Sequence, residues 1–439
     1  MLLTDVYQLT MLQAYYLENM TGTAVFEMFV RRLPENRNFC VAAGLEQCLE
    51  YLENFRFTDD ECDWLAGCGF FQAEFVDYLS TLRFTGDVHA LAEGTVLFPN
   101  EPIIRITAPL PEAQIIETRL INLLQFQSMI ASKSVRNVLA APDKLLVDFG
   151  LRRAHGFEAG LLAARASYIT GFAGTSNVLA AKEYGIPMVG TMAHSFIMAH
   201  DDEGQAFESF AHSQPDNVVL LIDTYDTEAG ALKVAELAPK LERVGMKIKA
   251  VRLDSGDLIG LSKRVREIFD RAGLSETEIF ASGDLDEFAL HRLLKAGSPL
   301  DGFGVGTKLI TSADQPYLNC AYKLQEYAGK PRRKYSPGKE TWPGRKQVYR
   351  FYDDTGKMDH DLLTLESDTQ SGEALLQPVM KTGCRCGTSD SLIAIRDRMK
   401  GQLTGLPEAL KSITRSAPYP VKIGEALSAL VEQMTREHL

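Results

Sequence analysis

The chain has 439 residues, enough for two or three domains of roughly 150 residues each. Apolar residues make up 45% of it and charged residues 24%, which excludes wholesale disorder, a fibre and a coiled coil. The 46 basic and 58 acidic residues give a net charge of −12, so nucleic acid is not an expected partner, because its phosphates require a basic face. No apolar run reaches the ~18 residues of a membrane-spanning helix and no signal peptide is evident, so no membrane partner is expected.

The cysteines are odd in number and irregularly spaced, which favours reduced thiols in a cytoplasmic protein. Cys384 and Cys386 could form half of a zinc site. A second pair of cysteines or histidines at ligand spacing is missing from the sequence, so metal binding there is not favoured.

Residues 1–115 are expected to form an α+β domain. Apolar residues recur at helical spacing over residues 9–17 and 45–55, whereas residues 24–30 alternate as in a strand. Residues 88–106 combine β-branched runs with turn residues and predict a small antiparallel set of strands.

A long helix is predicted over residues 111–139. So much of its surface is apolar that we expect burial between domains or subunits.

Residues 116–324 are expected to form an α/β domain. From residue 145 on, the order strand, polar turn, helix recurs about seven times, which predicts a parallel sheet. The expected strands are residues 145–150, 169–174, 187–190, 218–222, 248–253, 278–281 and 302–305. Expected helices include residues 228–241, 258–272 and 286–295. Because the units do not fall into two halves, a closed barrel is favoured over an open doubly wound sheet, with reactive groups where strands end.

Residues 325–439 are expected to pack on the N-terminal domain as strands and helices. Residues 331–344 are basic and rich in Pro and Gly, as in a loop or linker. Strands are expected at residues 347–352 and 362–365, and one or two helices over residues 406–439.

Polar side chains and glycines gather at the predicted strand ends. The segments are Phe149-Gly150-Leu151-Arg152-Arg153, Gly174-Thr175-Ser176, Gly190-Thr191-Met192-Ala193-His194-Ser195, Asp223-Thr224-Tyr225-Asp226, Arg252-Leu253-Asp254-Ser255-Gly256-Asp257, Ser282-Gly283-Asp284 and Gly304-Val305-Gly306-Thr307. Arginines and glycine amides suit phosphate, and carboxylates suit ribose hydroxyls or Mg²⁺. The set therefore predicts a phosphorylated sugar bound with magnesium, and Ser282 and Gly283 are among the expected contacts.

Each motif alone allows a structural reading. The segment 304–307 could be a plain strand-end turn, since it lacks the third glycine and the acidic residue of a dinucleotide site. Asp254 and Asp257 could cap a helix, although that leaves Arg252 unexplained. His194 could be a core histidine with satisfied hydrogen bonds, or a nucleophile or proton carrier.

Five segments, in the same order along the chain, resemble the nicotinate phosphoribosyltransferase family. They are Leu3-Thr4-Asp5-Val6-Tyr7-Gln8, Phe149-Gly150-Leu151-Arg152-Arg153-Ala154, Gly190-Thr191-Met192-Ala193-His194-Ser195, Val251-Arg252-Leu253-Asp254-Ser255-Gly256-Asp257-Leu258 and Gly304-Val305-Gly306-Thr307. The resemblance spans residues 3 to about 323, and the C-terminal quarter is expected to carry little of it.

The resemblance implies an irregular α/β barrel beside a domain built from both chain ends. It implies synthesis of nicotinate mononucleotide from nicotinate and phosphoribosyl pyrophosphate in NAD biosynthesis, with release of pyrophosphate. It also implies coupled ATP hydrolysis, Mg²⁺ as cofactor, and a cytoplasmic homodimer with active sites at the interface.

The family's site residues carry over onto matching positions. His194 takes the place of the autophosphorylated histidine. Tyr7 of the partner subunit and Phe149 take the positions that sandwich the pyridine ring, and Arg252 and Thr191 match nicotinate contacts.

The remaining matches concern phosphate and polar contacts. Gly304, Gly306 and Thr307 match a phosphate site, and Arg152 and Asp254 match polar contacts to the substrates, with Asp254 expected to act beside the histidine.

Other functions stay open on the sequence. In nicotinamide-using relatives an aspartate follows the Gly-Thr pair where this chain has Ser176, which favours nicotinate because an aspartate would repel a carboxylate. Quinolinate is disfavoured because a dicarboxylate calls for more basic residues at the strand ends. An inactive relative that binds a phosphorylated metabolite or a partner protein is the remaining alternative.

Overall fold

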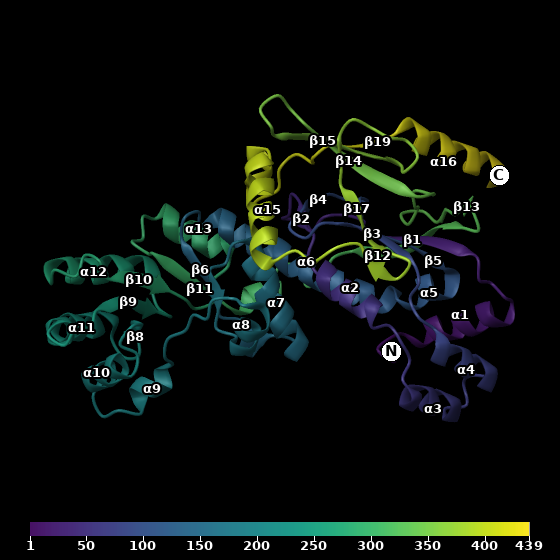
Figure 1. The fold of residues 1–439 in the computed structure, drawn as a ribbon. Coiled ribbons are helices and arrows are strands. Elements are labelled where there is room, and N and C mark those ends of the chain that lie inside the picture. The colour runs from purple at the N-terminus through teal and green to yellow at the C-terminus, as the bar shows by residue number, and fades with distance from the viewer. Residues whose placement is uncertain (439) are drawn as a thin grey trace. The chain divides into compact units, whose positions relative to one another are not determined.

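The computed structural model describes residues 1–438. It divides into two compact units (Figure 1). The terminal unit combines Met1–Ser132 with Tyr317–Leu439, and the central unit is Lys133–Pro316. The expected class, an α/β domain with a parallel sheet and a second domain built from both chain ends, is confirmed.

The terminal unit is built on a seven-stranded sheet in the order β13-β12-β1-β5-β3-β17-β18. Its strands are β1 (Thr23–Val30), β3 (Asp87–Leu91), β5 (Pro102–Pro109), β12 (Cys320–Tyr327), β13 (Lys330–Pro331), β17 (Leu376–Lys381) and β18 (Cys384–Arg385). All their pairings are antiparallel, and β1 pairs with β5 and β12, so the two ends of the chain share one sheet. Every residue of β1 after Thr23 is buried, because both faces of the sheet are covered there.

Two smaller sheets complete the strands of this unit. One has the order β16-β14-β15-β19 and the other pairs β2 with β4. Their strands are β2 (Cys40–Val41), β4 (Val96–Leu97), β14 (Lys346–Tyr352), β15 (Met358–Leu365), β16 (Glu373–Ala374) and β19 (Val421–Ile423). The helices are α1 (Val6–Leu17), α2 (Leu45–Glu53), α3 (Asp59–Gly67), α4 (Ala73–Thr81), α5 (Leu110–Ile115), α15 (Leu392–Gly405) and α16 (Glu425–His438). The predicted helix near 111–139 is present as α5 and the longer α6 (Glu117–Ala140), which crosses the boundary between the units.

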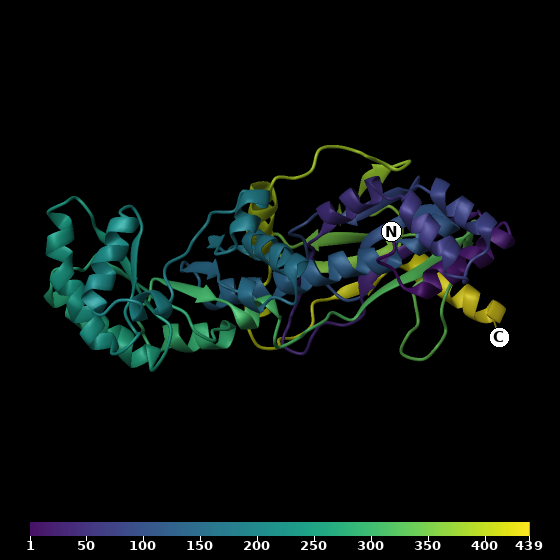
Figure 2. The ribbon, with the colours of Figure 1, turned by 90° about the horizontal axis from the view of Figure 1, so that it is seen from below.

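The central unit contains a six-stranded parallel sheet in the order β7-β6-β11-β10-β9-β8. Its strands are β6 (Leu145–Asp148), β7 (Gly174–Thr175), β8 (Val218–Leu221), β9 (Ile248–Leu253), β10 (Glu278–Ala281) and β11 (Gly302–Val305). Its helices are α7 (Phe157–Thr170), α8 (Val178–Tyr184), α9 (His194–Met198), α10 (Glu203–Ser213), α11 (Thr227–Glu242), α12 (Leu258–Arg271), α13 (Glu287–Lys295) and α14 (Thr307–Ile310). Helices α11 and α12 lie side by side next to strands β8–β10 (Figures 1 and 2).

Aspartates start several of these helices. The side chains of Asp202, Asp226 and Asp286 accept hydrogen bonds from backbone N–H groups in the first turns of α10, α11 and α13. Such caps satisfy donors that have no partner within the helix. Helices α11 and α13 start after the turns that follow β8 and β10, whereas α10 follows α9.

The parallel sheet differs from the expected seven-stranded ring at one edge. Residues 169–174 were expected as a strand, but Ile169 and Thr170 end α7, whose Ala-rich sequence favours a helix up to Gly171. Residues 187–190 contribute one parallel bridge, between Thr175 and Met188, and no full strand. The hydrogen-bonded ladder of the described residues therefore ends at β7 and β8 as a half-barrel.

The C-terminal tail also differs in part from expectation. Residues 406–439 were expected to be helical, and α16 confirms one helix. Val421–Ile423 instead forms β19, which pairs in parallel with β15, because its β-branched residues suit a sheet edge.

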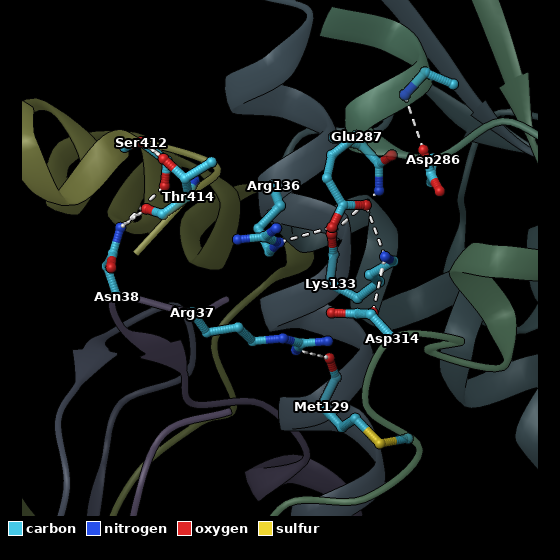
Figure 3. Close-up of polar contacts among 12 residues, drawn as sticks. Arg37, Asn38, Met129, Lys133, Arg136, Asp286, Glu287, Asp314, Ser412 and Thr414 are labelled. Atoms are coloured by element: carbon cyan, nitrogen blue, oxygen red, sulfur yellow. Dashed lines mark hydrogen bonds and ion pairs between the residues drawn. The ribbon is translucent and has the colours of Figure 1, made fainter. Parts of the chain in front are cut away.

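A cluster of buried ion pairs joins three segments of the central unit. Glu287 on α13 contacts the Lys133 ammonium at 2.7 Å and the Arg136 guanidinium at 2.8 Å, and Asp314 contacts Lys133 at 2.8 Å (Figure 3). In the terminal unit, Asn38 donates to the carbonyls of Ser412 and Thr414, which ties the two ends of the chain together (Figure 3). Along residues 1–438, no helix combines the length and apolar content that crossing a bilayer requires.

Candidate active site

The carboxyl ends of the parallel strands bring the predicted site residues of the central unit to one edge. Arg252 on β9 pairs in register with Phe280 on β10, and Asp148 on β6 pairs with Val305 on β11. The residues that follow these positions therefore leave the sheet together, as the strand pattern predicts.

Arg252 is the centre of a polar cluster. Its Nε donates to the Ser282 hydroxyl at 2.8 Å, and one Nη donates to the Thr191 hydroxyl at 3.3 Å and the Met192 carbonyl at 3.2 Å. The other Nη donates to the Asp254 carboxylate at 2.7 Å. Because a guanidinium carries five N–H groups, at least one Nη hydrogen has no partner among residues 1–438 and remains available to a ligand.

His194 belongs to the same cluster. Its Nδ1 lies 3.1 Å from the Thr224 hydroxyl, and its Nε2 lies 3.8 Å from the Asp254 carboxylate. Its side chain is 38% exposed, so the imidazole is open to an incoming ligand and is no core histidine. The Asp254 carboxylate therefore stands between His194 and Arg252 and contacts both.

The electrostatics keep Asp254 ionised. Burial alone would raise its pKa, but the hydrogen bond from Ser282 and the charge of Arg252 outweigh burial, and the pKa lies below its usual value. The histidine thus faces a negative charge at neutral pH.

The Phe149 ring forms the aromatic part of the site. The Arg252 guanidinium carbon lies 5.4 Å from the ring centroid, close enough for a cation–π contact. A Cβ added at Gly304 would come within 2.3 Å of this ring, so only glycine leaves room for it. Gly304 therefore has a packing role beside any contact to phosphate.

Four other expected residues have no hydrogen bond to Arg252, Asp254 or His194 in the described structure. Arg152 is exposed in the short 3-10 helix Leu151–Arg153, and Thr307 is exposed at the start of α14. The backbone N–H of Ser176 donates to the Asp148 carbonyl at 2.9 Å, which holds Ser176 at the edge of the sheet. Tyr7 lies in the terminal unit, 46% exposed in the first turn of α1, and its role in ring binding stays a prediction.

Asp223 and Thr224 belong to the predicted strand-end segments but had no role assigned to them, and Asp148 was not among the predicted site residues. Asp223 accepts hydrogen bonds from the Asp254 backbone at 2.8 Å and the Ser255 hydroxyl at 2.7 Å, and Thr224 contacts His194. Buried Asp148 accepts from the Gly150 backbone and from a threonine hydroxyl on β7, each at 2.8 Å. All three lie at the end of an apolar run or directly after one, and this position was the sequence feature that could have marked them as site residues.

Fold and site together define an α/β protein with a polar ligand site at the carboxyl ends of parallel strands, the place where such folds carry chemistry. The comparisons with known proteins identify the family. Residues 2–125 match the N-terminal domain of nicotinate phosphoribosyltransferase, residues 145–331 match the nicotinate phosphoribosyltransferase family, and residues 368–431 match its C-terminal domain. The chain belongs to the nicotinate phosphoribosyltransferase family.

Individual relatives support this assignment along the whole chain. The chain is 48% identical over 433 residues to the nicotinate phosphoribosyltransferase pncB2 of Mycobacterium tuberculosis, covering 97% of this chain and 92% of the relative. It is 38% identical to nicotinate phosphoribosyltransferase of Bacillus subtilis, covering 96% and 92%. The crystal structure of human nicotinic acid phosphoribosyltransferase superposes with a TM-score of 0.89 at 29% identity, covering 99% of this chain and 100% of that one.

The match over residues 368–431 corrects one expectation. The C-terminal quarter carries a family domain, contrary to the expectation of little resemblance there. That expectation rested on the polar strand-end motifs, all of which lie before residue 324, whereas the family match extends to residue 431.

Proposed function

We propose that the chain makes nicotinate mononucleotide and pyrophosphate from nicotinate and phosphoribosyl pyrophosphate, in NAD biosynthesis. The observation that carries the proposal is the single Asp254 carboxylate placed between Arg252 and His194, with the Phe149 ring against Arg252. One site thus combines a surface for a flat aromatic acid with groups for a phosphorylated ligand. The names of the relatives agree with this assignment.

The reaction needs positioning more than proton transfer. The pyridine nitrogen of nicotinate attacks C1 of the ribose, the bond from C1 to pyrophosphate breaks, and positive charge builds at C1 in between. Because the ring nitrogen is itself the nucleophile, no general base is required, which fits a site built from an arginine, a carboxylate and hydroxyls.

Nicotinate is proposed to lie on Phe149, with its carboxylate accepting from the free Nη hydrogen of Arg252. Arg252 is also paired with Asp254, which partly neutralises its charge, so Arg252 would bind the nicotinate carboxylate less tightly than an unpaired arginine. We also propose a homodimer in which Tyr7 of the partner subunit covers the other face of the pyridine ring.

The carboxylates fit a magnesium ion. One oxygen of Asp223 is buried and has no hydrogen-bond partner among the described residues, and Asp254 follows the neighbouring strand. Among residues 1–438, no group of three or more histidine, cysteine or carboxylate side chains is arranged as a complete metal site. Asp223 and Asp254 would therefore hold Mg²⁺ together with substrate phosphates and water, and the ion would disperse charge on the pyrophosphate.

We further propose that ATP hydrolysis is coupled through His194. An imidazole nitrogen attacks the γ-phosphorus, the bond to the β-phosphate oxygen breaks, ADP leaves, and the imidazole gives its proton to solvent. Water later cleaves the N–P bond and releases phosphate. The phosphoryl group adds about two negative charges beside Asp254, which favours binding of Mg²⁺ with phosphoribosyl pyrophosphate until hydrolysis favours product release.

Replacing His194 with alanine tests the coupling. We expect His194→Ala to take up no acid-labile label from γ-labelled ATP, to hydrolyse no ATP, and to show a raised KM for phosphoribosyl pyrophosphate. The matched control is His212→Ala, because His212 is exposed in the last turn of α10, away from the site. Unchanged labelling and coupling in His194→Ala would refute the role.

A further inference from the structure

A pocket of about 450 Å³ lies in the central unit between the segments that follow β9 and β10. Gly256, Asp257 and the start of α12 form one side, and Gly283–Asp286 with α13 forms the other. Lys308, in the first turn of α14, lines it as well. Gly283, which the sequence predicts as a substrate contact, lines it, whereas Phe149, Arg252, Asp254 and His194 do not.

One wall of the pocket is apolar and includes an aromatic ring. Leu258, Ile259 and Leu293 line it together with Phe288, whose side chain belongs to the exposed hydrophobic residues at 38% exposure. The Arg136 guanidinium carbon lies 5.6 Å from the Phe288 ring centroid. Arg136 is itself fixed by the buried Glu287 (Figure 3), so the ring is held in place while part of it stays open.

The pocket also contains the Lys308 ammonium, whose ion pair with Asp284 can be replaced by one with a ligand. Lys308 lies 3.2 Å from Asp284 and 3.3 Å from Asp286. Asp286 is pinned because it caps α13 by accepting from the Ala289 backbone at 2.8 Å. The Asp284 side chain is 79% exposed and free to move aside, so a phosphate oxygen can take its place at Lys308.

The pocket borders the candidate active site. A Cβ added at Gly283 would lie 1.9 Å from the Asp254 carbonyl oxygen, so the rim of the pocket rests directly on Asp254. The carboxylate of Asp254 is in turn 3.8 Å from His194. Asp254 thus adjoins both the rim of the pocket and the imidazole.

We propose that this pocket binds the adenosine half of ATP, with the base on Phe288 and a phosphate on Lys308. The inference rests on the proposed ATP coupling and supplies the nucleotide subsite for it. A purine base has a flat apolar face that matches the wall, whereas a sugar phosphate leaves Phe288, Leu258 and Ile259 unused. An adenine nucleotide is therefore the occupant that contacts both the apolar wall and Lys308.

The test measures labelling of His194 by γ-labelled ATP in the full-length protein, without nicotinate or phosphoribosyl pyrophosphate. We expect Phe288→Ala to raise the ATP concentration for half-maximal labelling about tenfold, as loss of a base–aromatic contact does. Phe288→Tyr keeps the ring and is expected to stay within about twofold of the unchanged protein. Leu232→Ala, an exposed apolar position on α11, is the matched control.

Two further measurements separate the possible occupants. AMP should compete with ATP in the unchanged protein and lose potency about tenfold in Phe288→Ala, whereas inorganic triphosphate should lose none. A rise in the KM for phosphoribosyl pyrophosphate with no change for ATP would assign the pocket to the sugar phosphate and overturn the proposal. An unchanged ATP requirement in Phe288→Ala would also overturn it.

The same experiment distinguishes this inference from the proposed function. If the unchanged protein forms nicotinate mononucleotide but takes up no label, the synthesis stands and the nucleotide subsite fails. If it takes up label in a Phe288-dependent way but forms no mononucleotide, the subsite stands and the proposed synthesis fails.

Discussion

At the scale of single residues, Asp254 connects the two halves of the proposed chemistry. It accepts from Arg252 and Ser282 on one oxygen and faces His194 with the other. Its pKa stays low because these donors stabilise the charged form more than burial destabilises it. The carboxylate is therefore charged at neutral pH.

Removing the Ser282 hydroxyl should raise the pKa of Asp254. A depressed pKa contributes stability above the ordinary aspartate value of about 3.9, and that stability is lost as the pH falls through the folded-state pKa. We expect Ser282→Ala to move the acid limb of the kcat/KM profile, and the onset of acid unfolding, to higher pH. Ser213→Ala, an exposed serine at the end of α10, is the control. An acid limb that stays in place would contradict the assignment.

Position 176 should decide between an acid and an amide substrate. A carboxylate there would repel the carboxylate of nicotinate, so we expect Ser176→Asp to raise the KM for nicotinate at least about tenfold. Ser176→Asn has nearly the same shape without the charge and should change the KM for nicotinate much less. Tighter nicotinate binding by Ser176→Asp would mean that residue 176 does not face the ring substituent.

The site residues differ in how far the sequence could predict them. Arg252, Asp254 and His194 were predicted because unusual polar residues follow apolar strands there. Asp223 and Thr224 were also predicted at a strand end, but their hydrogen-bond partners Asp254 and His194 were not, because those pairings depend on the order of the strands. A single sequence does not reveal that order.

At the scale of elements, helix α13 is anchored by buried charge. Glu287 is fully buried and contacts Lys133 and Arg136, which are themselves almost fully buried. Glu287→Gln would remove the carboxylate that contacts both Lys133 and Arg136, while the contact between Lys133 and Asp314 remains. We expect the free energy of unfolding to fall by about 3 kcal/mol, the usual cost of breaking a buried pair.

The control for this change is an exposed ion pair on the same unit. Glu228 and Arg264 are 48% and 45% exposed, so Glu228→Gln should cost less than about 1 kcal/mol. Denaturant unfolding of both variants measures the difference. A loss for Glu287→Gln as small as that of Glu228→Gln would show that the buried cluster does not hold the helix.

Strand prediction succeeded where apolar runs were isolated and failed where helix and strand share a composition. Strands β8–β11 were predicted because short apolar runs end in glycine or small polar residues there. Residues 169–174 were misassigned because an apolar helix end and a buried strand look alike over so few residues. The single bridge at Met188 forms only where β7 supplies Thr175 as a partner, so the sequence near Met188 does not predict it.

At the scale of the whole molecule, the chemistry-bearing cluster belongs to the central unit, while both ends of the chain build the terminal unit. Similarity to the family nevertheless extends over 97% of the chain. The family domain at residues 368–431 was not predicted, because the motifs that carry the resemblance in the sequence end before residue 324.

The most direct test is one assay of the full-length protein with phosphoribosyl pyrophosphate and Mg²⁺, in which nicotinate, nicotinamide and quinolinate are compared with and without ATP. We predict that nicotinate is converted to its mononucleotide with release of pyrophosphate, that ATP increases the rate or the yield, and that the other two acceptors react far more slowly. Preference for nicotinamide or quinolinate, or no mononucleotide from nicotinate under any of these conditions, would contradict this prediction.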